Sequence, residues 1–190
     1  MKKQKLVICD LDGTLFDTRK VNYMAYREAI ASVGLPVNFD YEKYLRECWG
    51  PTYREFLPIM GVPKERQEEI HDLKKDFYEA NLKYATENTH LFNIIKVMRS
   101  EYYTAVVTSG SRNAKDILKY FNRYDLFDVI FTIDDVKRGK PDPEGFFKAM
   151  EYFGVEGKDT IIFEDSSVGL AAARKTGASI CLIDDFNRSR

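Results

Sequence analysis

Five short apolar runs constrain the fold of this chain more than any other feature. They lie at residues 6–9, 104–107, 129–131, 160–163 and 180–183. Between most of these runs, apolar residues recur at helical spacing, as Phe146, Met150 and Phe153 do. Continuous apolar strands that alternate with helices are typical of a parallel sheet covered on both faces. The sequence therefore predicts an α/β fold in which helices flank a parallel sheet.

The stretch between the first two runs differs, because it contains more than ninety residues without a strand-like run. Its apolar residues follow helical spacing instead. They are Val21, Met24, Ala25, Ala29 and Val33 in one segment, and Ile70, Leu73, Phe77 and Tyr84 in another. We expect a helical insertion, or cap, at residues 18–86, within a core formed by residues 1–17 and 87–190.

Charge and composition exclude several classes of protein. With 29 basic and 30 acidic residues the net charge is −1, which gives no reason to expect nucleic acid as a partner. No apolar run approaches the roughly 18 residues that a membrane span needs, so no membrane partner is expected either. Cys9, Cys48 and Cys181 show no metal-binding spacing, and we expect them to be small buried residues of a cytoplasmic protein.

A pair of aspartates directly follows the first apolar run, in the segment Asp10-Leu11-Asp12-Gly13-Thr14-Leu15. Open parallel sheets bind ligands at the carboxyl ends of their strands, which is where these residues would lie. Gly13 permits the turn that lets both carboxylates converge, since it has no Cβ to clash. The alternative is an acidic turn without function, because Asp and Gly are common in such turns.

Polar groups also follow three later runs. Thr108-Ser109-Gly110 offers a hydroxyl and backbone N–H groups that could bind an anion, although a helix N-cap is the structural alternative. Lys140 precedes a helix whose N-cap and first residue would be Asp142-Pro143, so it is either functional or simply solvated. Glu164-Asp165 abuts the fourth run, where two carboxylates are unfavourable unless a cation or hydrogen-bond donors meet them.

Together, the expected strand ends carry two carboxylate pairs, a hydroxyl and a lysine. Oxygen ligands of this kind suit Mg²⁺, which binds a few carboxylates and keeps room for water and a phosphate. The lysine and the cation would offset repulsion among the carboxylates. The sequence therefore predicts a magnesium site at one edge of the sheet.

These residues resemble, in order, the four motifs of the haloacid dehalogenase superfamily. The motifs are Asp10-Leu11-Asp12-Gly13-Thr14, Thr108, Lys140 and Glu164-Asp165. The segments at 139–143 and 163–170 resemble the branch that contains phosphoglycolate phosphatase and β-phosphoglucomutase. That branch inserts a helical cap after the first strand, so the resemblance covers nearly the whole chain and implies a Rossmann-like core.

The resemblance implies a phosphatase that works by two displacements. Asp10 would attack phosphorus and form an aspartyl-phosphate, and Asp12 would act as general acid and then as general base. Thr108 and the Ser109 N–H would hold the phosphoryl oxygens, while Lys140 would stabilise the nucleophile and the phosphate. The substrate would be a small phosphorylated metabolite, and we expect a monomer or weak dimer.

The resemblance also implies Mg²⁺ as the cofactor. Its ligands would be the Asp10 carboxylate, the Asp12 backbone carbonyl, and one or both of Glu164 and Asp165. The sequence leaves open which member of the last pair binds directly.

Departures from the family pattern separate the alternatives. Asp12 argues against dehalogenases and phosphonoacetaldehyde hydrolases, which lack this second aspartate. Asn22 stands where β-phosphoglucomutases carry a histidine, so a sugar phosphomutase is the weaker enzyme hypothesis. A phospho-acceptor signalling module is a third hypothesis, but its acceptor aspartate would lie on the third strand and no cap would follow the first.

In the cap, the segment 49–54 resembles a loop that faces the active site in this branch. Arg54 could bind a carboxylate or phosphate of the substrate, and Trp49 or Tyr53 could line the pocket. The alternative, which we favour, is that Trp49 and Tyr53 pack cap helices and that Arg54 is solvated.

Overall fold

The computed structural model describes residues 3–110, 113–184 and 186–187. The chain divides into two compact units. One consists of Met1–Asp17 and Thr86–Arg190 and is termed the core unit; the other, Thr18–Ala85, is termed the cap unit.

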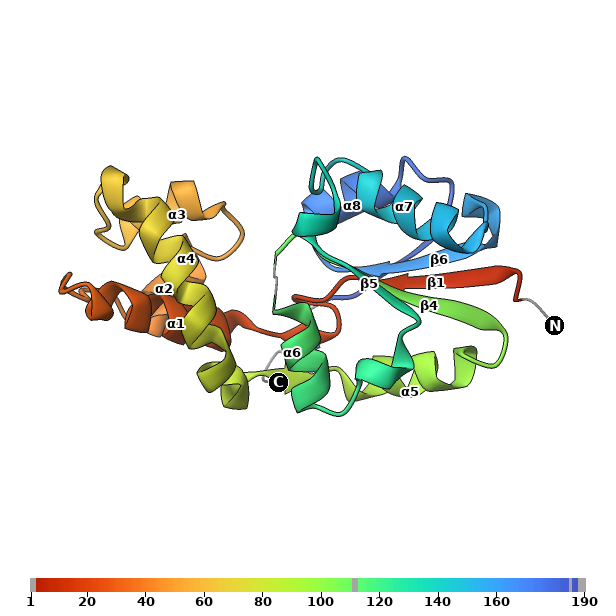
Figure 1. The fold of residues 1–190 in the computed structure, drawn as a ribbon, viewed down its shortest axis with the longest axis horizontal. Helices are drawn as coiled ribbons and strands as arrows, with labels where there is room; N and C mark the ends of the chain where they lie inside the picture. The colour runs from red at the N-terminus through yellow and green to blue at the C-terminus, as the bar shows by residue number, and fades with distance from the viewer. Residues whose placement is uncertain (1–2, 111–112, 185, 188–190) are drawn as a thin grey trace. The chain divides into compact units, whose positions relative to one another are not determined.

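A five-stranded parallel sheet forms the centre of the core unit, in the order β5-β4-β1-β6-β7 (Figure 1). Its strands are β1 (Lys5–Cys9), β4 (Tyr102–Val107), β5 (Val129–Phe131), β6 (Thr160–Glu164) and β7 (Ser179–Leu182). Each of the five apolar runs thus falls on one strand, except that Ile183 lies just after β7, and the predicted α/β fold with a parallel sheet is confirmed.

Helices cover both faces of this sheet, with α7 and α8 on one face and α5 and α6 on the other (Figure 1). They are α5 (Thr89–Met98), α6 (Ala114–Tyr120), α7 (Glu144–Phe153) and α8 (Ser167–Ala173). Leu6 and Ile8 lie two apart on β1 and therefore point to the same face. They form a buried cluster with Phe146 and Ala149 of α7, whose spacing places both on one side of the helix.

Three elements differ from the sequence prediction. The stretch expected to lack strands supplies β2 (Phe16–Asp17) and β3 (Thr86–Glu87), which pair antiparallel within the core unit. Such short strands carry no periodic pattern. In addition, α7 begins at Glu144 with Pro143 as N-cap, one residue later than expected, and Asp142 Oδ1 accepts a hydrogen bond from the Glu144 N–H at 3.0 Å.

The cap unit is helical throughout its regular elements. It contains α1 (Arg19–Ser32), α2 (Tyr41–Glu47), α3 (Tyr53–Ile59) and α4 (Gln67–Tyr78), with 3₁₀ turns at Lys64–Arg66 and Glu79–Tyr84. Helices α1 and α4 pack against each other. The unit has its own apolar cluster, which includes Ile30, Tyr44, Leu57 and Ile70. It therefore buries a core independently of the sheet.

Within the part of the chain that the structure describes, no helix has the length and apolar character that crossing a bilayer requires. Cys9 and Cys48 are buried as expected, but Cys181 is exposed because it lies on the edge strand β7.

Candidate active site

The register of the sheet brings the first and fourth motifs to the same edge. Cys9 of β1 lies opposite Val106 of β4 on one side and Phe163 of β6 on the other. The residues that follow Cys9 and Phe163 are Asp10 and Glu164, so their carboxylates leave neighbouring strands at the same level. The Asp10 N–H donates to the Phe163 carbonyl at 2.9 Å, which continues the ladder up to the aspartate.

Lys140 connects these two carboxylates. Its Nζ donates to Asp10 Oδ1 and, at 2.6 Å, to Glu164 Oε2. All three side chains are buried, with exposed fractions of 7% for Lys140, 9% for Asp10 and 0% for Glu164. Residues 130 positions apart in sequence thus form one ion-pair cluster.

Burial and charge shift the pKa values in this cluster. Burial would lower the pKa of the Lys140 ammonium, but Asp10 and Glu164 outweigh it and raise that pKa above its usual value. Burial raises the pKa of Asp10 above its usual value. The positive charge of Lys140 opposes this shift, whereas the negative charges of Glu164, Asp12 and Asp165 add to it. Burial also raises the pKa of Asp165 to about 6, with the neighbouring Glu164 charge adding to the effect. Burial is thus the main reason that Asp10 and Asp165 are harder to ionise than usual, and neighbouring carboxylates add to it.

Glu164 is held at both carboxylate oxygens. Oε1 accepts hydrogen bonds from Ser166 Oγ at 2.8 Å, from the Ser166 N–H at 3.2 Å and from the Asp165 N–H at 3.3 Å. The other oxygen, Oε2, accepts from Lys140. A β-carbon at Gly169 would lie 2.0 Å from Glu164 Cδ, so α8 approaches the carboxylate closely only because this residue is glycine.

A cation fits the carboxylates at this edge of the sheet. Asp10, Glu164 and Asp165 can each present an oxygen such that the three atoms lie within 4.8 Å of one another. Oxygen donors of this type suit a hard divalent cation, and Mg²⁺ and Ca²⁺ are the usual ones. Neighbouring acids add to burial in raising the pKa values of Asp10 and Asp165, and a bound cation would offset that repulsion.

Asp12 and the second motif lie close to each other. A β-carbon at Gly110 would lie 3.0 Å from Asp12 Oδ2, which places that carboxylate beside the turn after β4. In this turn the Gly110 N–H donates to Thr108 Oγ1 at 3.1 Å, and the Thr108 side chain is buried. Ser109 Oγ accepts from the Lys140 N–H at 2.9 Å and so ties the second motif to the third.

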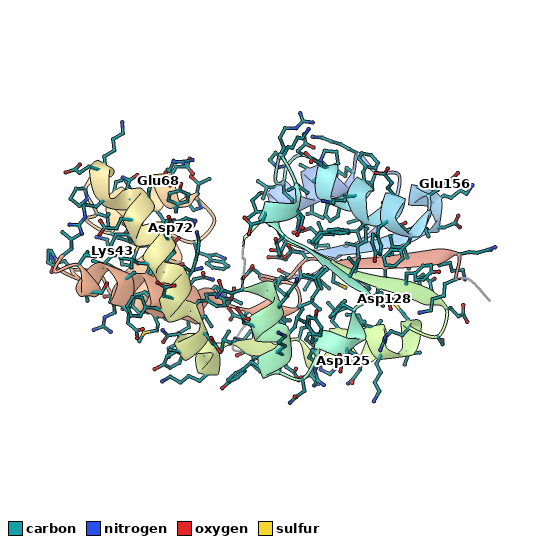
Figure 2. The ribbon with its side chains drawn as sticks, viewed as in Figure 1. Lys43, Glu68, Asp72, Asp125, Asp128 and Glu156 are labelled. Atoms are coloured by element: carbon teal, nitrogen blue, oxygen red, sulfur yellow. The ribbon has the colours of Figure 1, made fainter. Side chains whose placement is uncertain are left out.

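The cap candidates Tyr53 and Arg54 contact Glu68 of α4, which is labelled in Figure 2. The Tyr53 hydroxyl donates to Glu68 at 2.8 Å, and Arg54 donates to Glu68 Oε1 from Nε at 3.2 Å and from Nη2 at 2.7 Å. Tyr53 also stacks on His71 at 3.9 Å between ring centroids, and Trp49 packs against the apolar cluster of the cap. Arg54 and Glu68 remain about two-thirds exposed.

Sequence reasoning missed two residues of the site. Thr14 Oγ1 donates to Asp165 Oδ1 at 3.0 Å, and Ser166 supplies donors to Glu164. Each is a hydroxyl residue within or next to a motif that was recognised. That adjacency was the available signal, since hydroxyl side chains commonly orient neighbouring carboxylates.

Comparisons with known proteins agree with this geometry. The family model of haloacid dehalogenase-like hydrolases matches residues 7–183. A phosphorylated carbohydrates phosphatase of Thermotoga maritima is 32% identical over 178 residues, covering 90% of this chain and 81% of the relative. The β-phosphoglucomutase of Bacillus subtilis is 26% identical over 181 residues, covering 91% of this chain and 80% of the relative.

A solved structure supports the fold. The crystal structure of CbbY from Rhodobacter sphaeroides in complex with phosphate has a TM-score of 0.79 and 22% identity, and the match covers 98% of this chain and 89% of that one. The family resemblance predicted from the four motifs, including its phosphatase and phosphoglucomutase branch, is thereby confirmed. This chain belongs to the haloacid dehalogenase-like hydrolase family.

Proposed function

We propose that this chain is a Mg²⁺-dependent phosphatase that hydrolyses a phosphorylated sugar or a similar small metabolite. The observation that carries the proposal is the buried cluster of Asp10, Glu164 and Lys140 at the carboxyl edge of the sheet, with Asp165 beside it. Similarity to a phosphatase of phosphorylated carbohydrates supports the class of substrate.

In the proposed reaction, Asp10 is the nucleophile and Asp12 the acid and base. A carboxylate oxygen of Asp10 bonds to phosphorus while the bond from phosphorus to the leaving oxygen breaks. Asp12 gives that oxygen a proton and later accepts one from the water that hydrolyses the aspartyl-phosphate. Because Lys140 contacts Asp10 at Oδ1, the orientation of the nucleophilic carboxylate is restricted before substrate arrives.

Three further residues are proposed to hold the phosphoryl group. Lys140 carries a positive charge next to the nucleophile, where negative charge accumulates as phosphorus is attacked. Thr108 and the Ser109 N–H lie in the turn that Asp12 approaches, and they would donate to the phosphoryl oxygens. The hydrogen bond from the Lys140 N–H to Ser109 Oγ would hold this turn and the lysine in a fixed relative position.

Mg²⁺ would be held by the Asp10 carboxylate, the Asp12 backbone carbonyl and one or both of Glu164 and Asp165. When bound, the cation supplies positive charge that stabilises negative charge on the phosphoryl oxygens. Both oxygens of Glu164 already accept hydrogen bonds from protein groups. We therefore propose Asp165 as the direct ligand of this pair and Glu164 as the residue that anchors Lys140.

The cap unit, expected from sequence at 18–86, is proposed to provide substrate specificity. As a substrate ligand, Arg54 would have to exchange Glu68 for an anionic group of the substrate, because Glu68 occupies two of its donors. Tyr53 would change partners in the same exchange, since its hydroxyl also donates to Glu68.

The test is phosphate release from a panel of sugar monophosphates with Mg²⁺ present. We expect release by the wild type, loss of release with EDTA, and a decrease on the order of a thousand-fold or more in Asp10→Asn. Unchanged release by folded Asp10→Asn would show that the nucleophile is assigned wrongly.

Similarity to a β-phosphoglucomutase favours a sugar phosphomutase as the second candidate. Such an enzyme would convert a hexose 1-phosphate to the 6-phosphate when primed with a bisphosphate. Asn22 speaks against it, because β-phosphoglucomutases carry a histidine at this position. The Asn22 side chain donates to the Thr18 carbonyl at 3.1 Å. Isomer formation that exceeds phosphate release in the same assay would favour the mutase.

A further inference from the structure

The carboxylates of the site are held by different groups. Asp10 and Glu164 share Lys140, whereas Asp165 accepts a hydrogen bond from the Thr14 hydroxyl at 3.0 Å. Thr14 is completely buried, so water does not compete with Asp165 for its hydroxyl. The position of Asp165 therefore depends on the loop that carries Asp12 and Thr14.

The same loop contacts the other oxygen of Asp165. A β-carbon at Gly13 would lie 2.1 Å from Asp165 Oδ2, and Gly13 has a φ of +90° that favours glycine. The Gly13 backbone thus passes directly against the carboxylate. A displacement of this loop would move both the hydroxyl that binds Oδ1 and the backbone that limits Oδ2.

Asn88 fixes this loop from the other side. Its Nδ2 donates to the Thr14 carbonyl at 3.2 Å, and its backbone N–H donates to the Leu15 carbonyl at 2.9 Å. Its Oδ1 caps α5 by accepting from the Leu91 N–H at 3.2 Å, which determines the orientation of the amide. Asn88 is buried and directly follows β3.

We infer that Thr14 and Asn88 are positioning residues that hold the Asp165 carboxylate in place for the cation. Asn88 fixes the Thr14–Leu15 backbone, and Thr14 in turn orients Asp165 through its hydroxyl. The inference rests on the proposed function in one respect, namely that Asp165 binds Mg²⁺. Residues that hydrogen-bond metal ligands typically change metal affinity about 10- to 100-fold when they are replaced.

Calorimetric titration of the full chain with Mg²⁺ tests this without any substrate. We expect Thr14→Val, which keeps the shape but removes the hydroxyl, to weaken Mg²⁺ binding about ten-fold, and Thr14→Ser to restore it to within about two-fold. Asn88→Asp keeps the oxygen that caps α5 but loses the donor to Thr14, so we expect weaker binding there too. Because both act through Asp165, the Thr14→Val and Asn88→Asp effects should be less than additive.

The matched control is Thr160→Val. Thr160 is also buried, on the same strand as Glu164, but at its other end, where its hydroxyl donates to the Glu156 carbonyl at 2.9 Å. Because this hydroxyl does not contact the site, the Thr160→Val variant should lower the melting temperature without changing the Mg²⁺ dissociation constant. If Asn88→Asp does not fold, Asn88→Ser replaces it, because serine also retains an oxygen suited to the N-cap.

The outcomes separate the two levels of the proposal. A wild-type chain that binds no Mg²⁺ would overturn the proposed function and the inference with it. Wild-type binding with unchanged affinity in folded Thr14→Val would overturn the inference alone, as would an equal loss in Thr160→Val. Weaker binding in Thr14→Val with unchanged binding in the Asn88 variants would remove Asn88 from the assignment.

Discussion

The Lys140 ammonium forms ion pairs with two buried carboxylates of the core unit and compensates their negative charge. It contacts Asp10 and Glu164, and no more than 9% of any of the three side chains is exposed. Removing one partner of a buried ion pair costs about 3–5 kcal/mol, because the remaining charge stays buried without compensation. We therefore expect Lys140→Met to lower the free energy of unfolding by about that amount, measured by urea denaturation without Mg²⁺.

A double variant shows whether uncompensated charge is the cause. Lys140→Met combined with Glu164→Gln removes one buried carboxylate together with the lysine, so it should be more stable than Lys140→Met alone. Equal stability of the two variants would mean that lost packing of the lysine side chain, rather than charge, explains the effect.

The pKa of Asp165 predicts how Mg²⁺ binding depends on pH. Without a cation it is raised from 3.8 to about 6, so the folded chain binds more protons than the unfolded chain between these values. The contribution of Asp165 to stability is therefore full below about pH 4 and is lost as the pH rises through about 6. Because the proposed Mg²⁺ would bind the ionised carboxylate, we expect it to raise the melting temperature more at pH 7.5 than at pH 5.

Thermal unfolding with and without Mg²⁺, with NaCl added to match ionic strength, measures this difference. Protons should also be released on binding near pH 6, and calorimetry in buffers of different ionisation enthalpy would detect them. A stabilisation by Mg²⁺ that is the same at both pH values would contradict the assignment of Asp165 as a ligand.

Sequence placed Asp10, Glu164 and Asp165 at the site because they directly follow apolar runs and parallel strands end at a common edge. Lys140 lies further along the connection between β5 and α7 and was placed there as part of the same set of motifs. It did not reveal which groups hold them. The bond from Thr14 to Asp165 joins residues 151 positions apart and depends on the rotamers of both. Neither spacing nor composition encodes such a contact.

Among whole elements, α3 carries the cap candidates Tyr53 and Arg54, and α4 carries their partner Glu68. Arg54 at the start of α3 and Glu68 on α4 are joined by two hydrogen bonds but remain largely exposed. Exposed pairs of this kind contribute little to stability. We expect Glu68→Gln to leave the melting temperature close to that of the wild type and to lower KM for substrates with a second anionic group, since Arg54 becomes available.

Glu69→Gln is the control from the same helix. Glu69 pairs with Arg66, and its side chain is 46% exposed, so Glu69→Gln changes the charge equally without freeing Arg54. Steady-state kinetics with a sugar monophosphate and a bisphosphate would separate the two variants. If Glu68→Gln and Glu69→Gln change KM alike, overall charge and not Arg54 is responsible.

At the level of elements, the strands of the sheet were predictable and the shortest elements were not. Residues 6–9 lie in β1, the central strand of the sheet, and all four are fully buried, because a strand covered on both faces must be apolar on both. Strands β2 and β3 have two residues each. Their pairing places Phe16, just before the helical insertion, opposite Glu87, just after it. Two such short strands, paired across the whole insertion, leave no periodic pattern in the sequence by which they could be predicted.

At the scale of the whole molecule, each of the two units has a buried apolar cluster of its own. Leu57 is fully buried in the cluster of the cap unit, and Ile8 is fully buried in the cluster of the core unit. Truncation of either residue to alanine should cost about 2–5 kcal/mol. Because the clusters belong to different units, we expect each loss to remain within the unit that contains it.

Hydrogen exchange resolved along the chain measures this directly. Leu57→Ala should reduce the protection of amides in Thr18–Ala85 while the amides of β1 and β6 keep their wild-type values. Ile8→Ala is the reciprocal control and should reduce protection in the sheet. Since protection reports the free energy of the opening that exposes each amide, an equal decrease in β1, β6 and the cap helices after Leu57→Ala would mean that both units unfold together.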